Sequence, residues 1–290
     1  MHEDLLETAV TAARAGADVL RRYFRHAGLE VSRKGQNDFV TQADKESEDA
    51  VLAVIHERYP DHRILAEEGS AAGLNRDSDH EWLIDPLDGT TNFLQGLPVY
   101  CVSIACRRAG EVVAAAVLDP EGNNLFTATR GGGAQWNGRP MSASRHGGLD
   151  GAFLATGYPF RAISTLDLYL NIFRDVFRRS KAVRRCGSAA LDLAYTAAGV
   201  YDGFFEFRLS PWDIGAGVLL VEEAGGRVSD LDGGAGYFRG GNVVAGGSAV
   251  QPELWEVVSG HAREADLERL NPLGAPAGPA IGAAGVAGPP

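Results

Sequence analysis

The chain is short of cysteine, and its cysteines are not placed as pairs. Cys101, Cys106 and Cys186 are an odd number in 290 residues, and none belongs to a Cys-x-x-Cys motif. Disulfide frameworks need an even set of cysteines, and thiolate-ligated zinc sites use closely spaced pairs. The sequence therefore excludes both kinds of site and favours a reducing compartment, which we expect to be the cytoplasm.

Long apolar runs are also missing. No stretch reaches the roughly 18 uninterrupted apolar residues that a membrane-spanning helix needs. The first residues, MHEDLLETAVTAARAG, carry acids early and lack the basic start and continuous apolar stretch of a signal peptide. We therefore expect no membrane partner.

Positive charge is the third scarcity. Lys and Arg number 27 against 38 Asp and Glu, for a net charge of −11. This charge repels the phosphate backbone of nucleic acid unless basic residues gather on one face, so nucleic acid is not expected as the main partner. A phosphorylated small molecule would be repelled too. A phosphate site here would need positive charge from metal ions or helix N-termini.

The first half of the sequence has the pattern of a mixed helix and strand protein. Apolar residues at three- and four-residue steps predict a helix through about residue 24, and a second helix follows Asp44 and ends near Tyr59. Segments 64–66 and 82–84 predict short buried strands. Alternating β-rich runs over 99–130 predict an antiparallel meander, and Asn137-Gly138 adds a tight hairpin.

The second half alternates the same two kinds of element. We expect strands near 152–155 and 203–207, and helices near 165–178, 188–198 and 212–224. Helices covering sheets made partly of antiparallel strands place the chain in the α+β class.

The domain organisation follows from length and composition. We expect one compact unit over residues 1–270 with two lobes, at about 1–145 and 146–270. Residues 271–290 are rich in Gly, Pro and Ala and offer little apolar surface to offset the entropy lost on ordering. We expect them to form a disordered tail.

Two carboxylates follow a predicted strand in the segment WLIDPLDGTTNF. Asp85 ends strand 82–84, and Asp88 precedes Gly89 and Thr90 at a predicted helix start. Carboxylates this close raise each other's pKa, so keeping both ionised calls for cations, and oxygen ligands select hard metals such as Mg²⁺. A helix N-terminus with glycine would suit a phosphate. The alternative is that both aspartates cap a turn and a helix.

Two further acidic sites stand elsewhere in the chain. Glu67 and Glu68 follow strand 64–66, and Asp213 opens a helix rich in small residues. Taken singly, Glu67 and Asp213 are typical of loop or capping acids. In combination with Asp85 and Asp88 they indicate a metal site.

Four motifs carry a resemblance to a known family. DFVTQAD (38–44), the Glu67-Glu68 pair, DPLDGTTNF (85–93) and WDIGAG (212–217) occur in the order and at the spacings of the inositol monophosphatase family. The sequence resembles that family, within the Mg²⁺-dependent, lithium-sensitive sugar phosphatase superfamily, over about residues 5–265. Ala66 and Gly215 depart from its pattern, but neither replaces a ligand.

The resemblance implies a fold, a metal site and an activity. The fold would be a layered αβαβα sandwich with the metals at the junction of two lobes, and the protein would be a homodimer. Glu67, Asp85 and the carbonyl of Leu87 would hold one Mg²⁺, and Asp85, Asp88 and Asp213 a second, with a weaker third ion near Glu67. The activity would be that of a phosphoric monoester hydrolase.

The resemblance also implies catalytic residues. Thr90 and Asp44 would orient and deprotonate the attacking water, with Glu67 beside them. The alternatives are that Asp44 is the N-cap of a helix and that Thr90 is simply the first residue of another.

Substrate contacts are implied in the same way. Glu206 would hydrogen-bond the inositol ring, although an acid at a strand end is also typical of a solvated surface. The full set implied for substrate binding is Asp88, Gly89, Thr90, Gly187, Ser188, Ala189, Glu206 and Asp213.

Several readings of function stay open at this level. Inositol 1-phosphate is the substrate expected first, and fructose 1,6-bisphosphate, histidinol phosphate and phosphoadenosine phosphate are alternatives. A regulatory or binding protein that keeps the fold and contacts its partner through the basic segment 178–185 is a further alternative. The run Gly131–Gly133 predicts a turn rather than a phosphate cradle, because a hairpin follows it.

Overall fold

The structure is a computed structural model that describes residues 2–26, 31–35, 38–69, 78–158, 160–263 and 266–267. The tail predicted at 271–290 lies outside these ranges. Among the helices of the described ranges, none has the length and hydrophobicity needed to cross a membrane.

A seven-stranded sheet forms the core of the first half, in the order β3-β4-β5-β6-β7-β8-β9. The pair β3 and β4 is parallel and every later pair is antiparallel. The strands are β3 (Arg63–Ala66), β4 (His80–Asp88), β5 (Cys101–Arg108), β6 (Glu111–Asp119), β7 (Asn124–Thr129), β8 (Gly133–Trp136) and β9 (Arg139–Pro140). The predicted meander is confirmed.

A five-stranded sheet forms the core of the second half, in the order β11-β10-β12-β14-β13. Its strands are β10 (Phe153–Thr156), β11 (Ala182–Arg184), β12 (Gly203–Glu206), β13 (Arg227–Ser229) and β14 (Val243–Gly246). A separate hairpin joins β1 (Val31–Gly35) to β2 (Asp38–Thr41). Sequence patterns had indicated only β10 and β12 among these, because strands of three to five residues show little periodicity.

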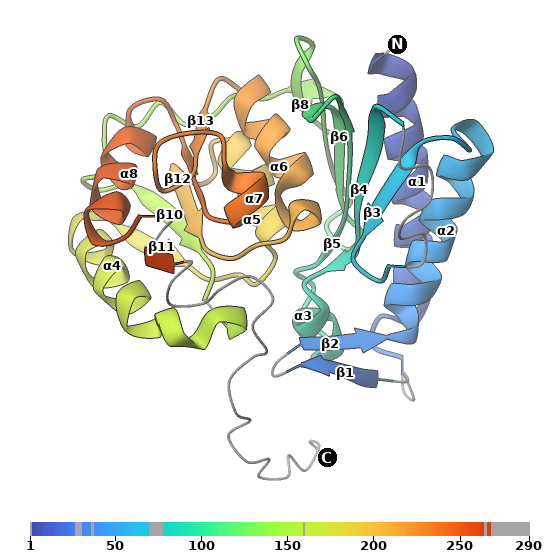
Figure 1. Cartoon of the computed structure of the whole chain (residues 1–290), viewed down its shortest axis with the longest axis horizontal. Helices are drawn as coiled ribbons and strands as arrows, with labels where there is room; N and C mark the ends of the chain where they lie inside the picture. Colours follow the sequence, from blue (N-terminus) through green and yellow to red (C-terminus); the bar gives the residue numbers. More distant parts are fainter. Residues whose placement is uncertain are drawn as a thin grey trace.

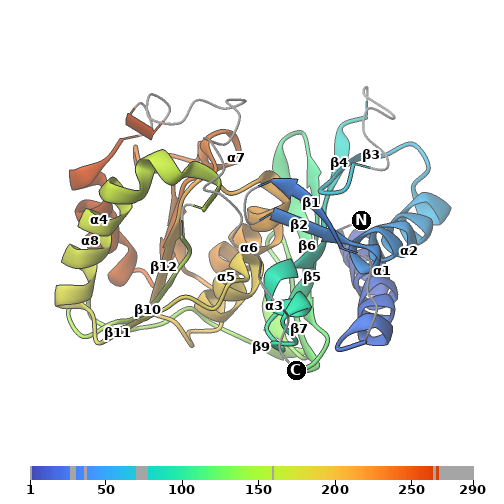
Figure 2. The same cartoon turned by 90° about the horizontal axis from the view of Figure 1, so that it is seen from below.

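The helices fill the spaces around the two sheets. They are α1 (His2–Tyr23), α2 (Gln42–Arg58), α3 (Thr90–Leu94), α4 (Leu166–Arg179), α5 (Ala189–Ala197), α6 (Pro211–Glu223), α7 (Tyr237–Gly240) and α8 (Val250–His261), with a 3-10 turn at Phe160–Thr165. Helices α1 and α2 cover the outer face of the seven-stranded sheet, α5 and α6 lie between the sheets, and α4 and α8 cover the far face of the five-stranded sheet (Figures 1 and 2). This arrangement confirms the layered αβαβα architecture.

Small residues set the spacing of the central layer. A Cβ atom on Gly215 of α6 would lie 2.6 Å from Cδ1 of Leu83 on β4, and a Cβ on Gly217 would lie 2.5 Å from Cδ1 of Leu193 on α5. Real Cβ contacts are not this short, so α6 is held closer to both neighbours than an alanine would allow. Gly215, a departure from the family pattern, is therefore part of how this chain packs.

Two predicted turns are confirmed by backbone conformation. Asn137 (φ 50°) and Gly138 (φ 75°) both have positive φ between β8 and β9, as tight hairpin turns require. The run Gly131–Gly133 is the turn between β7 and β8, and the N–H groups of Gly131 and Gly133 donate to the Glu223 carboxylate at 2.9 Å each. This turn binds a side chain of α6, so the phosphate-cradle reading has no support.

Candidate active site

A single pocket collects the residues singled out from the sequence. It has a volume of about 370 Å³ and lies where the ends of β4, β10 and β12 meet the starts of α3, α5 and α6. Every predicted site residue except Asp44 lines it: Glu67, Asp85, Leu87, Asp88, Gly89, Thr90, Gly187, Ser188, Ala189, Glu206 and Asp213. Folding thus brings together segments from both halves of the chain.

A bulge in β4 places two of the carboxylates. The strand does not end at Asp85, as predicted, but runs on to Asp88. Asp85 pairs with Ser103 and Asp88 with Cys101, so two residues of β4 stand opposite one residue of β5. Pro86 is one of the two, and a bulge tolerates proline inside a strand because an N–H is left unpaired there.

Asp88 is tied to the second half of the chain. Its Oδ2 accepts hydrogen bonds from the Ser188 hydroxyl at 2.7 Å and from the Ala190 N–H at 2.7 Å. Ser188 is the N-cap of α5, and its Oγ also accepts from the Leu191 N–H at 3.4 Å. The start of α5 is therefore fixed directly against the carboxylates of β4.

The turn after Asp88 requires glycine. Gly89 has φ +99°, and a Cβ there would lie 2.9 Å from the carbonyl oxygen of Val99. A residue with a side chain would be strained on both counts. Gly89 therefore lets the backbone begin the short helix α3 at Thr90 beside the pocket.

Thr90 and Asp44 are in contact, as the resemblance implies. The Thr90 hydroxyl lies 3.3 Å from Asp44 Oδ1 and 3.1 Å from the Leu87 carbonyl oxygen. Asp44 is 1% exposed and does not line the pocket, so Thr90 stands between it and the cavity.

Asp44 also stabilises the start of α2, but not as the N-cap residue that the sequence offered as an alternative. The N-cap of α2 is Thr41, not Asp44, and the two form a capping box. Asp44 Oδ2 accepts from the Thr41 N–H at 2.8 Å and from the Thr41 hydroxyl at 2.5 Å. Capping and contact with Thr90 use different oxygens of the same carboxylate, so both coexist.

Burial and then mutual repulsion disfavour the ionised forms of the carboxylates. Burial raises the pKa of Asp85 well above its usual range, and the charges of Glu67, Asp88 and Asp213 raise it further. Burial and then Asp213 raise the pKa of Asp88 to about 6, although hydrogen bonds from Ser188 and Ala190 oppose this. Buried acids of one sign call for a cation.

The donor set fits a hard metal ion. Four carboxylates and the Leu87 carbonyl line one cavity, with no His or thiolate among the predicted ligands. Oxygen-only sets of this kind suit Mg²⁺ or Ca²⁺. The ligand geometry is not preformed, since in the described part of the chain no three His, Cys, Asp or Glu side chains are arranged as ligands of one ion.

The pocket is also lined by residues that sequence reasoning missed. They are Thr91, Thr156, Gly157, Tyr158, Arg185, Asp192 and Leu209. Gly157 is needed because the Glu206 carboxylate occupies the place where a Cβ would lie. Asp192 could have been found, because it is the only acid in the otherwise apolar helix α5.

The basic segment 178–185 is partly neutralised. Arg179 forms ion pairs with Asp150 at 2.7 Å and Glu253 at 2.6 Å, and Arg178 lies 3.7 Å from Asp175. Arg185 lines the pocket and stacks over Tyr158, with its guanidinium carbon 5.2 Å from the ring centroid. The segment therefore divides between surface ion pairs and the site.

Comparisons with known proteins agree with these motifs. Residues 1–265 match the profile described as the inositol monophosphatase family. The protein named Nus factor SuhB of Escherichia coli strain K12 is 51% identical, over 85% of this chain and 92% of that protein.

Solved structures show the same likeness. The extragenic suppressor protein suhB of Bartonella henselae is 40% identical with a TM-score of 0.84, covering 88% of this chain and 98% of that one. An inositol monophosphatase from Anabaena (Nostoc) is 38% identical with a TM-score of 0.80, covering 88% and 95%.

Proposed function

The chain belongs to the inositol monophosphatase family, and we propose that it is a Mg²⁺-dependent phosphatase of small polyol or sugar phosphates, with inositol 1-phosphate as the first substrate. One observation carries the proposal. Glu67, Asp85, Asp88 and Asp213 come from three separate segments and line one cavity large enough for such a ligand. Family members are metal-dependent phosphatases, and every carboxylate that the activity needs is present.

The carboxylates would hold the metal. Glu67, Asp85 and the Leu87 carbonyl would bind one Mg²⁺, and Asp85, Asp88 and Asp213 a second. When bound, the ions would supply the positive charge that a phosphoryl group requires in a protein of net charge −11. Mutual repulsion among these acids is the property that such binding would relieve.

Thr90 and Asp44 would handle the proton of the attacking water. Burial is the main reason that the pKa of Asp44 is raised to about 6, although hydrogen bonds from Thr41 oppose the shift. A base works best when its pKa lies near the operating pH, so Asp44 would accept a proton readily near neutrality. Because Thr90 stands between Asp44 and the pocket, its hydroxyl would pass the proton on.

The remaining lining residues would bind the substrate. The start of α3 at Gly89 and Thr90 would face the phosphate. Glu206 would accept a hydrogen bond from a hydroxyl of the leaving group, opposite the wall of Gly187, Ser188 and Ala189. Glu206 is 7% exposed, so a polar substrate group would suit it better than an apolar one.

The test is release of phosphate by the purified protein, with and without Mg²⁺. The substrates are inositol 1-phosphate, fructose 1,6-bisphosphate, histidinol phosphate and phosphoadenosine phosphate. We expect Mg²⁺-dependent release that is highest with inositol 1-phosphate and is lost in Asp88→Asn. Asp232→Asn, an exposed acid away from the pocket, is the matched control. A preference for another of these substrates would support the proposed phosphatase reaction but would reject inositol 1-phosphate as the first substrate.

A second function is favoured by the name of the relatives. Proteins 51% identical to the chain are called Nus factor SuhB, so we propose that this chain also acts as a Nus factor in transcription. Co-elution of the chain with bacterial RNA polymerase in gel filtration tests this. Retention by Asp88→Asn would separate binding from hydrolysis, and failure to co-elute under any condition would argue against the second function.

The proposed homodimer is tested on the same column. Light scattering of the eluted protein would give twice the chain mass of 30.7 kDa. A mass of one chain would reject the dimer.

A further inference from the structure

Asp192 is a buried acid that the proposed mechanism does not use. It is 2% exposed, lies in the wall of the pocket, and its Oδ1 accepts no hydrogen bond from the described residues. A buried carboxylate without a full set of partners destabilises a fold, and such groups in native proteins call for an explanation. The burial of this carboxylate in the pocket wall therefore needs an explanation.

Helix capping does not account for Asp192. The acid lies in the first turn of α5, where the helix dipole favours negative charge. Ser188 already caps this helix, however, and Asp88 accepts the Ala190 N–H. An exposed acid would gain the same dipole energy without burial. The position of Asp192 in the pocket wall is therefore the feature to explain.

Arg185 does not neutralise Asp192 by direct contact. Burial is the main reason that the pKa of Asp192 is raised well above its usual range, and the charges of Glu206 and Asp88 raise it further. The Arg185 charge opposes this shift, but no ion pair within 4.0 Å joins Arg185 to Asp192 in the described part of the chain. Arg185 instead lies over Tyr158, and its Nη1 would be 2.6 Å from a Cβ placed on Gly187. The guanidinium is thus held against the pocket rather than against Asp192.

Asp192 and Glu206 act on each other electrostatically, and both line the pocket. Together with Arg185, these residues give the pocket wall two acidic side chains and one basic side chain. Such a group can accept hydrogen bonds from hydroxyls and donate to hydroxyl oxygens. It would repel a second phosphate, because the negative charge shared by the two acids would face the charge of that phosphate.

We propose that Asp192 is a specificity-determining residue that accepts a hydrogen bond from a leaving-group hydroxyl and, with Glu206, selects a neutral polyol over a bisphosphate. The inference rests on the proposed phosphatase function and narrows its substrate class. Rotation about χ2 of aspartate is soft, so either oxygen can turn toward a bound hydroxyl. A neutral polyol would thus complete the hydrogen bonding of Asp192.

The experiment compares Asp192→Asn with wild type on three substrates. Inositol 1-phosphate has leaving-group hydroxyls, p-nitrophenyl phosphate has none, and fructose 1,6-bisphosphate carries a second phosphate. We expect kcat/KM to fall about 10- to 100-fold for inositol 1-phosphate, because asparagine replaces one acceptor oxygen with an NH2 group that can only donate. With p-nitrophenyl phosphate it should stay within about twofold, and the preference against the bisphosphate should shrink about tenfold.

A second variant and a binding measurement complete the test. Gly157→Ala moves the Glu206 carboxylate without touching Asp192, and its effects should fall on the same substrates. Calorimetric titration of the metal-free protein with myo-inositol should show binding that Asp192→Asn weakens about tenfold.

The outcomes separate the inference from the function on which it rests. An equal loss on p-nitrophenyl phosphate and inositol 1-phosphate would mean that Asp192 only supports the fold, and no loss on either would also overturn the inference. If wild type hydrolyses none of the three, the phosphatase proposal fails, and the titration alone decides whether Asp192 binds a polyol. Absence of binding by wild type would then reject the inference.

Discussion

Asp44 and Thr90 show how one residue can serve the fold and the site together. The Asp44 carboxylate caps α2 through one oxygen and reaches Thr90, 46 residues away, through the other. Reading such a residue as either a cap or a base is therefore a false choice. Its two oxygens allow both roles at once.

Thr90 should be needed for its hydroxyl and not for its shape. We expect Thr90→Ala to lower kcat about 100-fold, because the path from the pocket to Asp44 is removed. Thr90→Ser keeps the hydroxyl and should recover most of the activity. The measurement is steady-state phosphate release at saturating Mg²⁺. A serine variant as slow as the alanine variant would show that packing of the methyl group matters instead.

Asp85 should destabilise the metal-free protein and be required by the metal-bound one. Burial and then the charges of the neighbouring acids oppose its ionised form, so Asp85→Asn should raise Tm in the presence of a chelator. Mg²⁺ should raise Tm of wild type by mass action and leave the variant unchanged. Thermal unfolding with and without Mg²⁺ measures both effects. Equal responses to Mg²⁺ would remove Asp85 from the metal ligands.

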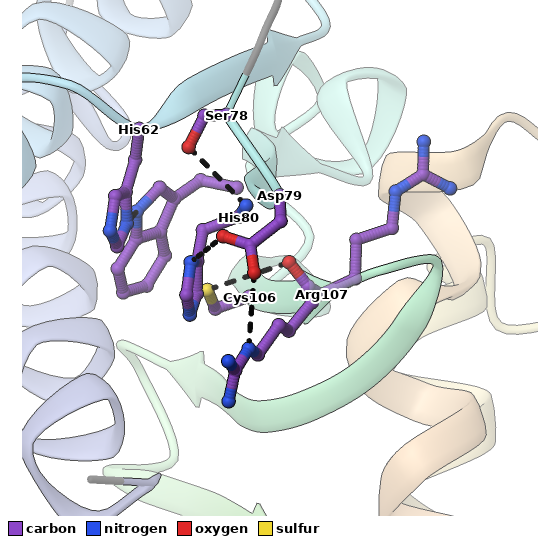
Figure 3. Close-up of polar contacts among 8 residues, drawn as sticks. His62, Ser78, Asp79, His80, Cys106 and Arg107 are labelled. Atoms are coloured by element: carbon purple, nitrogen blue, oxygen red, sulfur yellow. Dashed lines mark hydrogen bonds and ion pairs between the residues drawn. The ribbon is translucent and has the colours of Figure 1, made fainter.

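At the scale of single elements, the start of β4 differs in kind from its end. The end carries the carboxylates, whereas the start belongs to a stack of rings. His62 stacks on His80 with centroids 4.5 Å apart and on Tyr59 at the same distance. Figure 3 shows the two histidines side by side, with His80 contacting Asp79. The His80–Asp79 contact measures 2.7 Å between Nδ1 and Oδ1.

His62 needs to be neutral in this stack. Its Nδ1 accepts from the Trp82 indole N–H at 3.1 Å, and a protonated imidazole has no acceptor. Burial, followed by the charge of His80, lowers the pKa of His62 below its usual 6.5. The contribution of this stack to the free energy of unfolding is therefore complete above about pH 6.5. It is lost as the pH falls through the lower pKa that His62 has in the folded state.

His62→Gln should flatten this pH dependence, because glutamine keeps an acceptor for Trp82 and does not titrate. Urea midpoints measured between pH 5 and 8 should fall on acidification more steeply for wild type than for the variant. The exposed His26→Gln is the matched control and should keep the wild-type slope. Parallel curves for wild type and His62→Gln would show that the stack is not titrating.

At the scale of the whole molecule, α5 and α6 join the two halves. They lie between the sheets and share one core, in which Leu83 and Ala105 of the first sheet meet Phe204 and Val243 of the second. The starts of the same two helices line the pocket. The pocket thus lies at the helical layer through which the two sheets pack on each other. The division into two lobes at about residue 145 stays a prediction.

Gly217→Ala should strain this layer, because its Cβ would press on Leu193. We expect a loss of about 1–3 kcal/mol in the free energy of unfolding, as for other overpacked cores. Gly260→Ala in α8 adds the same methyl group in open space and should stabilise by about 0.4–1 kcal/mol. Urea denaturation of both variants gives the comparison. A neutral Gly217→Ala would show that the two helices separate easily.

Much of the site was predictable from sequence, because its residues stand in short local motifs. The runs 85–93 and 212–217 place the proposed ligands next to the residues that turn the chain, so each motif forms its own local geometry. Asp192 and Gly157 belong to no such motif. Their importance depends on Glu206, which lies on β12, a strand that contains neither residue, and is close to both in the fold.

Residue types and near neighbours were enough to indicate the family and the alternation of helices and strands, and to propose the acids of the site and a cation that would balance their charge. Those features depend on residue type and near neighbours, which a sequence states directly. The three-dimensional structure was needed to show that β4 bulges rather than ends at Asp85, that the Ser188 hydroxyl donates to Asp88, and that Asp192 lines the pocket with an oxygen unpaired. Each of these depends on contacts between distant segments, whose register and packing are settled only when the layers close on one another.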